Sequence, residues 1–146
     1  MNELSEMLQS EASDPRAKIM AIQAAIAQQP QIEFPVKHHF APGAYGREIL
    51  LFAGTVVVGK IHRHAHVNVI SQGRCTVYTE GDGLIELQAP ATFVSKPGTK
   101  RVVFAHTDVV WTTVHVTDET DLAKIEAAVI APSFDAIEHS ALQVLQ

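Results

Sequence analysis

Regularly placed turn signals between Ile32 and Thr117 constrain the fold of this chain more than any other feature of its sequence. Turn residues such as Pro42-Gly43 and Pro97-Gly98 divide this stretch into short runs rich in β-branched and aromatic residues. Many short strands joined by hairpin-type turns are typical of antiparallel sandwiches and barrels. We therefore expect an all-β antiparallel barrel with strands over residues 32–40, 47–52, 55–62, 66–71, 74–79, 84–88, 92–95, 101–106 and 109–117.

The residues before the barrel carry a helical pattern. Asp14-Pro15 is typical of an N-cap followed by proline at the first helical position. Ile19, Ile22 and Ile26 then recur at helical spacing, and Gln29-Pro30 ends the run. This apolar stripe should dock on the barrel or on a second copy of the chain, and we predict the second because a barrel fills its own core. The pattern therefore predicts a helical arm over residues 1–31 and a homo-oligomer.

A second helix is expected after the barrel, from about residue 119 to residue 130. Thr117 or Asp118 would cap it, and Ala131-Pro132 would end it. Its apolar stripe would consist of Leu122, Ile125 and Val129. The chain thus divides into an arm (1–31), a barrel (32–117) and a C-terminal helix and tail (118–146).

Composition excludes several classes of protein. A net charge of −5 argues against a nucleic-acid binder, which needs a basic surface to neutralise phosphates. The longest apolar runs are far too short to cross a bilayer, and the first residues lack the pattern of a signal peptide. A single cysteine, Cys75, excludes an internal disulfide framework, and its alternation with Val77 predicts a buried apolar role. These features predict a cytoplasmic protein.

Three histidines lie at every second position between Gly54 and Gly73, inside an apolar run. His62, His64 and His66 would project from one face of an extended strand unless a bulge intervenes. Imidazole is a common ligand of zinc, iron, copper and nickel. The spacing therefore suggests a divalent metal site, and the alternative is a polar face on an edge strand at the barrel mouth.

The same segment resembles the first motif of the cupins, which are small antiparallel jelly-roll barrels. That motif runs glycine, five residues, His, one residue, His, three or four residues, Glu, six residues, glycine. Gly54 and Gly73 match its ends and His62 its second histidine. Lys60 stands at the first histidine and His66 at the glutamate. The resemblance covers about residues 43–117, and a narrower similarity is to small cupin-like proteins of tailed phages.

The second cupin motif centres on Pro-x-Gly followed by histidine. Its best match is Pro97-Gly98, with Arg101 near the usual histidine. Trp111, Thr113 and His115 share one face of a later strand, so that His115 is the expected distant ligand and His106 the second choice. The candidate metal set is His62, His64, His66 and His115, with zinc, iron, nickel or manganese as the ion.

Other residues are candidates for binding a small molecule. Arg47, Lys60 and Arg101 would bind an anionic ligand by charge-assisted hydrogen bonds, unless they are ordinary surface charges. Trp111 would line the same pocket or belong to the core.

Two hypotheses on function follow. The first is a cupin-like protein that binds a divalent metal, a small ligand or both in its barrel, with metal-dependent chemistry on a small molecule as one form. The second is a non-enzymatic structural or interaction module that assembles through its N-terminal arm. A phage origin would make it a virion component or a protein of the host cytoplasm. The sequence leaves open whether the chain is an enzyme.

Overall fold

A computed structural model describes residues 2–9 and 14–134 of the chain. Its larger sheet has five antiparallel strands in the order β1-β2-β10-β5-β8. These are β1 (Val36–Ala41), β2 (Ala44–Leu51), β10 (Val109–Val116), β5 (His66–Gln72) and β8 (Ala91–Ser95). The smaller sheet has four antiparallel strands in the order β3-β9-β6-β7. These are β3 (Val56–Val58), β9 (Val102–Ala105), β6 (Arg74–Thr79) and β7 (Gly83–Gln88).

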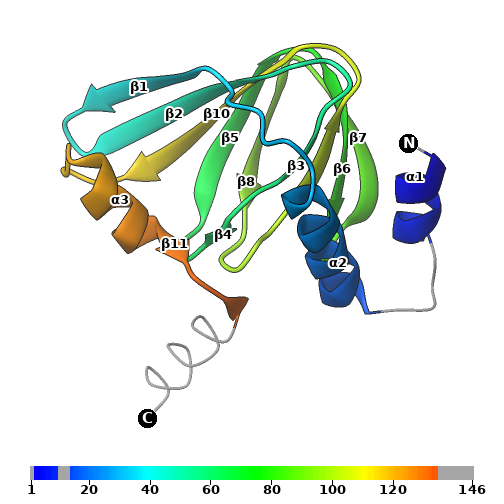
Figure 1. Cartoon of the computed structure of the whole chain (residues 1–146). Helices are drawn as coiled ribbons and strands as arrows, with labels where there is room; N and C mark the ends of the chain where they lie inside the picture. Colours follow the sequence, from blue (N-terminus) through cyan, green and yellow to red (C-terminus); the bar gives the residue numbers. More distant parts are fainter. Residues whose placement is uncertain (1, 10–13, 135–146) are drawn as a thin grey trace.

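The two sheets face each other across one apolar core (Figure 1). Along each strand, alternate residues point inward because successive side chains project to opposite faces. Ile70 of β5 and Val77 of β6 therefore meet between the sheets, and both are almost fully buried. The other buried members of this core are Leu51, Cys75, Val103, Ala105, Val109 and Trp111.

The N-terminal helices pack on the outer face of the smaller sheet. Helix α1 (Asn2–Gln9) and helix α2 (Pro15–Ala27) bury Leu8, Ile19 and Ile22 against the outward side chains of Tyr78 and Val102. Figure 1 shows α2 beside the strands of this sheet. The expectation that the isoleucine stripe needs a second subunit is wrong, because the chain's own sheet covers it. The homo-oligomer stays a prediction without that support.

Helix α3 (Leu122–Val129) lies where β10 ends and β2 begins (Figure 1). Its buried residues Ile125 and Val129 pack on Tyr45 of β2. The short strand β11 (Ile130–Ala131) follows at once and pairs with β4 (Ile61–His62). The C-terminal segment thus covers one end of the barrel, and this end carries the candidate site.

Most expected elements are present, and the differences have local causes. The strand expected over 55–62 is divided into β3 and β4 because the two halves pair with different partners, β9 and β11. Helix α3 is capped by Asp121 and not by Thr117 or Asp118, since the Asp121 carboxylate accepts from the Lys124 amide. Helix α1 and strand β11 were not expected. Residues 135–146 of the predicted tail lie outside the described residues.

The two motif glycines occupy positions that other residues adopt only with strain. Gly54 and Gly73 have φ values of 82° and 92°, in the left-handed region. At Gly73 a Cβ atom would also lie 2.2 Å from the carbonyl oxygen of Asp108. This turn between β5 and β6 therefore requires glycine for both conformation and space.

Among the residues that the structure describes, no helix has the length and apolarity that crossing a membrane requires.

Candidate metal centre

Strand register brings two histidines together at one end of the larger sheet. His66 begins β5 and His115 lies near the end of β10, its antiparallel neighbour. Val114 of β10 pairs with Val67 of β5. The next residue on β10 and the preceding residue on β5, His115 and His66, therefore lie opposite each other. Both side chains alternate with core residues, so both point between the sheets, and both are buried.

His62 reaches the same place from outside the two main sheets. It lies on β4, where its backbone is opposite Ile130 of β11. The Arg63 amide donates to the Val129 carbonyl at 2.8 Å, and the Gly98 amide donates to the His62 carbonyl at 2.8 Å. The α3–β11 segment and the turn at Gly98 therefore fix the position of His62.

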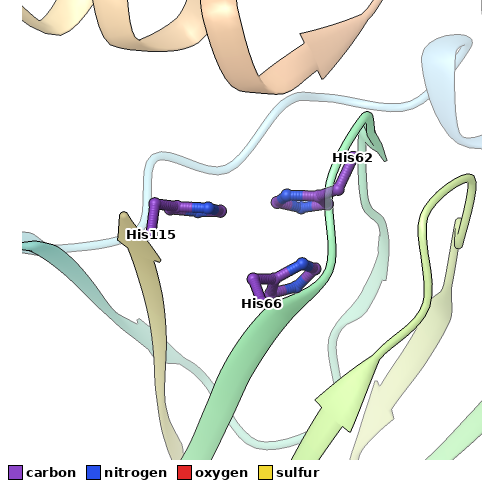
Figure 2. Close-up of side chains that lie close together, drawn as sticks. All are labelled: His62, His66 and His115. Atoms are coloured by element: carbon purple, nitrogen blue, oxygen red, sulfur yellow. The ribbon is translucent and has the colours of Figure 1, made fainter. Parts of the chain in front are cut away.

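The three imidazole rings form one cluster, the His62–His66–His115 triad (Figure 2). Ring centroids lie 4.1 Å apart for His62 and His66, 5.3 Å for His62 and His115, and 5.2 Å for His66 and His115. One ligand nitrogen from each residue falls within 4.8 Å of the others. Within residues 2–9 and 14–134, this is the one group of three or more metal-ligating side chains that close.

Two ring nitrogens in the triad have no hydrogen-bond partner although they are buried. These are Nδ1 of His62 and Nε2 of His66. The other nitrogen of His66, Nδ1, lies 3.3 Å from the carbonyl oxygen of His64. Because a carbonyl accepts, this contact places the proton on Nδ1 and leaves a free lone pair on Nε2. Metal-binding histidines commonly donate their second nitrogen to a backbone carbonyl in this way.

Burial keeps the triad in the neutral form that a metal needs. Desolvation, together with the neighbouring His66 and His115, lowers the pKa of His62 to about 3. Desolvation and the charge of His66 lower the pKa of His115 to about 4. The pKa of His66 is lowered too, first by desolvation, although its bond to His64 opposes the shift. Three neutral imidazoles, two of which have an unpaired buried nitrogen, fit a zinc-type or iron-type ion with open coordination positions.

His64 lies outside the triad, contrary to the expectation that it shares a face with His62 and His66. The chain leaves β4 after His62 and re-enters a strand only at His66, so strand alternation is lost between them. The His64 side chain is exposed, and its backbone contributes through the carbonyl that faces His66. His106, the second choice for a distant ligand, instead contacts the Thr76 hydroxyl through Nε2 at 2.6 Å.

Two of the expected anion-binding residues, Lys60 and Arg47, are exposed. Lys60 is exposed and forms an ion pair with Glu126 of α3, so its ammonium is directed away from the triad. Arg47 is exposed, and its charge and that of Arg101 both contribute to lowering the pKa of His62.

Trp111 is a buried core residue whose ring meets Phe93 edge-on. Cys75 is fully buried, as expected, and burial raises its pKa to about 11.

Two residues near the triad, Asn68 and Ser95, escaped the sequence reasoning, whereas Tyr45 was a candidate for the pocket lining or the core. Asn68 alternates with His66 on β5 and is fully buried, and this alternation could have identified it. Ser95 lies opposite His66, and only the register of β5 with β8 places it there. Tyr45 lies opposite His115, with ring centroids 6.3 Å apart, and burial raises its pKa. The Tyr45 hydroxyl contacts Nδ1 of His38 at 2.6 Å.

No protein-family model and no curated protein matches the sequence. Solved structures do match. Ectoine synthase from P. lautus gives a TM-score of 0.55 at 12% identity, with 68% of this chain and 74% of that chain covered. A cupin superfamily protein from Desulfitobacterium hafniense gives 0.50 at 10% identity, with 65% and 87% covered.

A third match is salicylate 1,2-dioxygenase from Pseudaminobacter salicylatoxidans, with a TM-score of 0.52 at 16% identity. It covers 77% of this chain but 33% of the dioxygenase, so the chain spans about a third of that enzyme. At such identities the similarity shows the fold and not the activity. The two facing antiparallel sheets, the turns at Gly54 and Gly73 and these matches together show that the protein has the fold of the cupin superfamily.

Proposed function

We propose that this protein is a metal-binding cupin that holds one divalent transition-metal ion through His62, His66 and His115. The remaining coordination positions would be open to a small-molecule ligand. His64 is exposed and lies outside the cluster, so it is left out of the ligand set. Zinc, iron, nickel and manganese are the candidate ions, because imidazole nitrogen suits several of them.

One observation carries this proposal: His62 and His66 each have an unpaired buried nitrogen, within a cluster in which one ligand nitrogen of each of the three histidines lies within 4.8 Å of the others. A buried polar atom without a partner costs about 1–3 kcal/mol. A purely structural cluster would bear this cost at two atoms with no compensation. A metal ion would accept both lone pairs, and the lowered pKa values of His62 and His66 keep those lone pairs free at neutral pH.

The surrounding residues would orient the ligands and exclude water. The His64 carbonyl holds the His66 ring in one tautomer, and the pairing of β4 with β11 holds His62. Helix α3 closes this end of the barrel by packing on Tyr45. When bound, an ion of this kind can polarise a carbonyl or carboxylate or activate water or dioxygen.

Two of the matching structures are enzymes by name, a synthase and a dioxygenase. This supports, by analogy of fold alone, chemistry on a small molecule as the use of the site. The proposal does not extend their substrates to this chain.

Metal titration of purified, tag-free protein tests the proposal. The wild type, the His62→Ala/His115→Ala double variant and the His64→Ala variant are stripped with chelator and titrated with zinc, nickel, manganese and, without oxygen, ferrous iron. We expect about one ion per chain for the wild type and for His64→Ala, and none for the double variant. His64→Ala is the matched control, because it removes an exposed imidazole from the same segment.

Circular dichroism and thermal melting verify that the double variant remains folded. Equal uptake by the wild type and the double variant would overturn the assignment of the ligands. Negligible uptake by all three proteins would favour the alternative, a non-enzymatic structural or interaction module. The phage relationship and the homo-oligomer belong to that alternative and remain predictions, and native mass measurement tests the second of them.

A further inference from the structure

Arg101 lies between the two sheets and not on the outside of the barrel. It precedes β9, where Val103 and Ala105 point into the core, and it continues their alternation. Its guanidinium carbon lies 5.5 Å from the ring centroid of Phe93 and 5.7 Å from that of Trp111. Contacts of this kind with two aromatic rings hold the cation inside the barrel.

A chain of hydrogen bonds ties this guanidinium to residues on the strands that carry the triad. Nη2 of Arg101 donates to the Ser95 hydroxyl, which also accepts from Nδ2 of Asn68 at 2.7 Å. Oδ1 of Asn68 in turn accepts from Nε1 of Trp111 at 3.0 Å. Ser95 is the register partner of His66, so Arg101 is anchored one strand away from a triad residue. Its charge contributes to lowering the pKa values of both His62 and His66.

No carboxylate within the described parts of the chain forms an ion pair with Arg101. Nη2 is the one guanidinium nitrogen that bonds to another described residue. Nε and Nη1 make no such bond, yet neither is among the fully buried unpaired atoms, so both keep some access to solvent. Asp82 attracts this cation only from beyond ion-pair distance. A largely buried cation without a direct ion pair is costly unless an anion joins it.

A metal ion in the triad would increase this imbalance. It would add two positive charges beside Arg101, and Arg47 already contributes a further positive charge at His62 and His115. An anion that contacts both the guanidinium and the metal would offset both charges. The guanidinium fork matches the two oxygens of a planar carboxylate.

We propose that the ligand of this site is a small carboxylate, whose carboxylate group binds the Arg101 guanidinium beside the triad-bound metal. The inference rests on the proposed metal site and names the class of its ligand. Carboxylate and metal then bind cooperatively, and each raises the affinity for the other by the same factor. Without a carboxylate, Arg101 opposes metal binding, because like charges repel.

Binding measurements on zinc-loaded protein test this assignment. The probes are acetate, pyruvate, oxalate and benzoate, with pyruvamide as the neutral match for pyruvate and inorganic phosphate as a second oxyanion. The variants are Arg101→Met, which keeps apolar bulk against Phe93 and Trp111, and Arg101→Lys, which keeps the charge but lacks the fork. Calorimetry gives the affinity, and elemental analysis gives the zinc content of each sample.

We expect pyruvate to bind the wild type more tightly than pyruvamide, and more tightly than phosphate. Arg101→Met is expected to lose carboxylate affinity by about 10- to 100-fold, the value of a charge-assisted hydrogen-bonded pair. The carboxylate affinity of Arg101→Lys should lie between the affinities of the wild type and Arg101→Met. In carboxylate-free buffer, Arg101→Met should bind zinc at least as tightly as the wild type. If Arg101 had only a structural role, its replacement would instead lower the zinc affinity.

Three results would overturn the inference: no carboxylate probe binds the zinc-loaded wild type, pyruvate and pyruvamide bind alike, or Arg101→Met binds pyruvate as the wild type does. In each case zinc uptake through the triad still stands. Failure of zinc uptake, in contrast, refutes the proposed function itself. The zinc-free protein then decides the role of Arg101, since retained, Arg101-dependent binding of carboxylates supports the carboxylate site and its absence overturns it.

Discussion

The two ends of the barrel interior are built by the same strands and have opposite character. At one end β5 and β10 contribute Ile70 and Val109, both fully buried among apolar neighbours. At the other end the same strands contribute His66 and His115, whose surroundings include unpaired nitrogens and a cation. Strand alternation decides that all four point inward. Position along the strand decides which end is apolar and which carries the candidate site.

A polar layer separates these ends. Asn68 and Trp111 lie between them on β5 and β10 and bond to each other. The apolar end gains stability from burial, whereas the triad end has the desolvation costs of its imidazoles and of Arg101. Damage to the apolar end should therefore affect folding, and damage to the triad end should affect binding. The predictions below test this division.

The largest effect is expected from Ile70→Ala at the apolar end. Ile70 is fully buried in the core between the sheets, so its truncation leaves a cavity. We expect a loss of about 2–5 kcal/mol in the free energy of unfolding, measured with urea. The folded variant should still bind metal with the affinity of the wild type. A loss of metal binding in the folded state would show that the two ends are not separable.

An intermediate effect is expected from Asn68→Ala in the polar layer. The change leaves Nε1 of Trp111 buried without its acceptor and removes a donor to Ser95. We expect a loss of about 1–3 kcal/mol in the free energy of unfolding. A double-mutant cycle with Trp111→Phe isolates the hydrogen bond. If the two substitutions are additive, the bond contributes nothing and the layer is only a packing feature.

A smaller effect should follow from pH at the triad end of the metal-free protein. Free histidine has a pKa of 6.5, whereas folding holds His62 at about 3 and His115 at about 4. Between these values the unfolded chain binds more protons, so stability is lost as pH falls from about 6.5 towards 4. By the same shifts, protons should displace a bound metal well below pH 6.5, the midpoint that free imidazole would predict.

Urea unfolding across this pH range measures the effect. The His62→Ala/His115→Ala variant should show a shallower loss of stability than the wild type, because it lacks two of the three histidines whose pKa values are lowered. His64→Ala, which removes an exposed imidazole, serves as the control and should keep the wild-type slope. Parallel slopes for the wild type and the double variant would contradict the shifted pKa values.

The smallest effect is expected from Lys60→Ala. Lys60 occupies the place of the first motif histidine, yet its side chain is 66% exposed and pairs with Glu126. Exposed ion pairs contribute about 0–1 kcal/mol, so stability should change by no more than that. Zinc affinity should change little, because the ammonium is directed away from the triad. A large gain in zinc affinity would show that Lys60 repels the ion after all.

Spacing along the chain predicted a large part of this molecule. The turn signals located most of the strands, because turn chemistry and the two-residue alternation are local properties. The motif between Gly54 and Gly73 predicted the cupin fold, and its glycines are required by backbone conformation. His115 was predicted from the face it shares with Trp111. Each of these features depends on residues close together in the sequence.

Other features were decided by pairing between distant segments. His64 has the right spacing but leaves the triad, because the chain breaks between β4 and β5 and β4 pairs with β11 instead. The isoleucine stripe of α2 looked free but is covered by the smaller sheet. Ser95 reaches His66 only through the register of β5 with β8. Local periodicity contains no information on such partners.

The sequence by itself therefore determined the strand pattern, the inward direction of most candidate residues and the family of folds. The tertiary structure decided which histidines meet, which cation is left without a direct ion pair and which surface is covered. The physical reason is a difference in range. Alternation and turn preference act over a few residues. The triad requires register between strands about 50 residues apart in the sequence, such as β5 with His66 and β10 with His115.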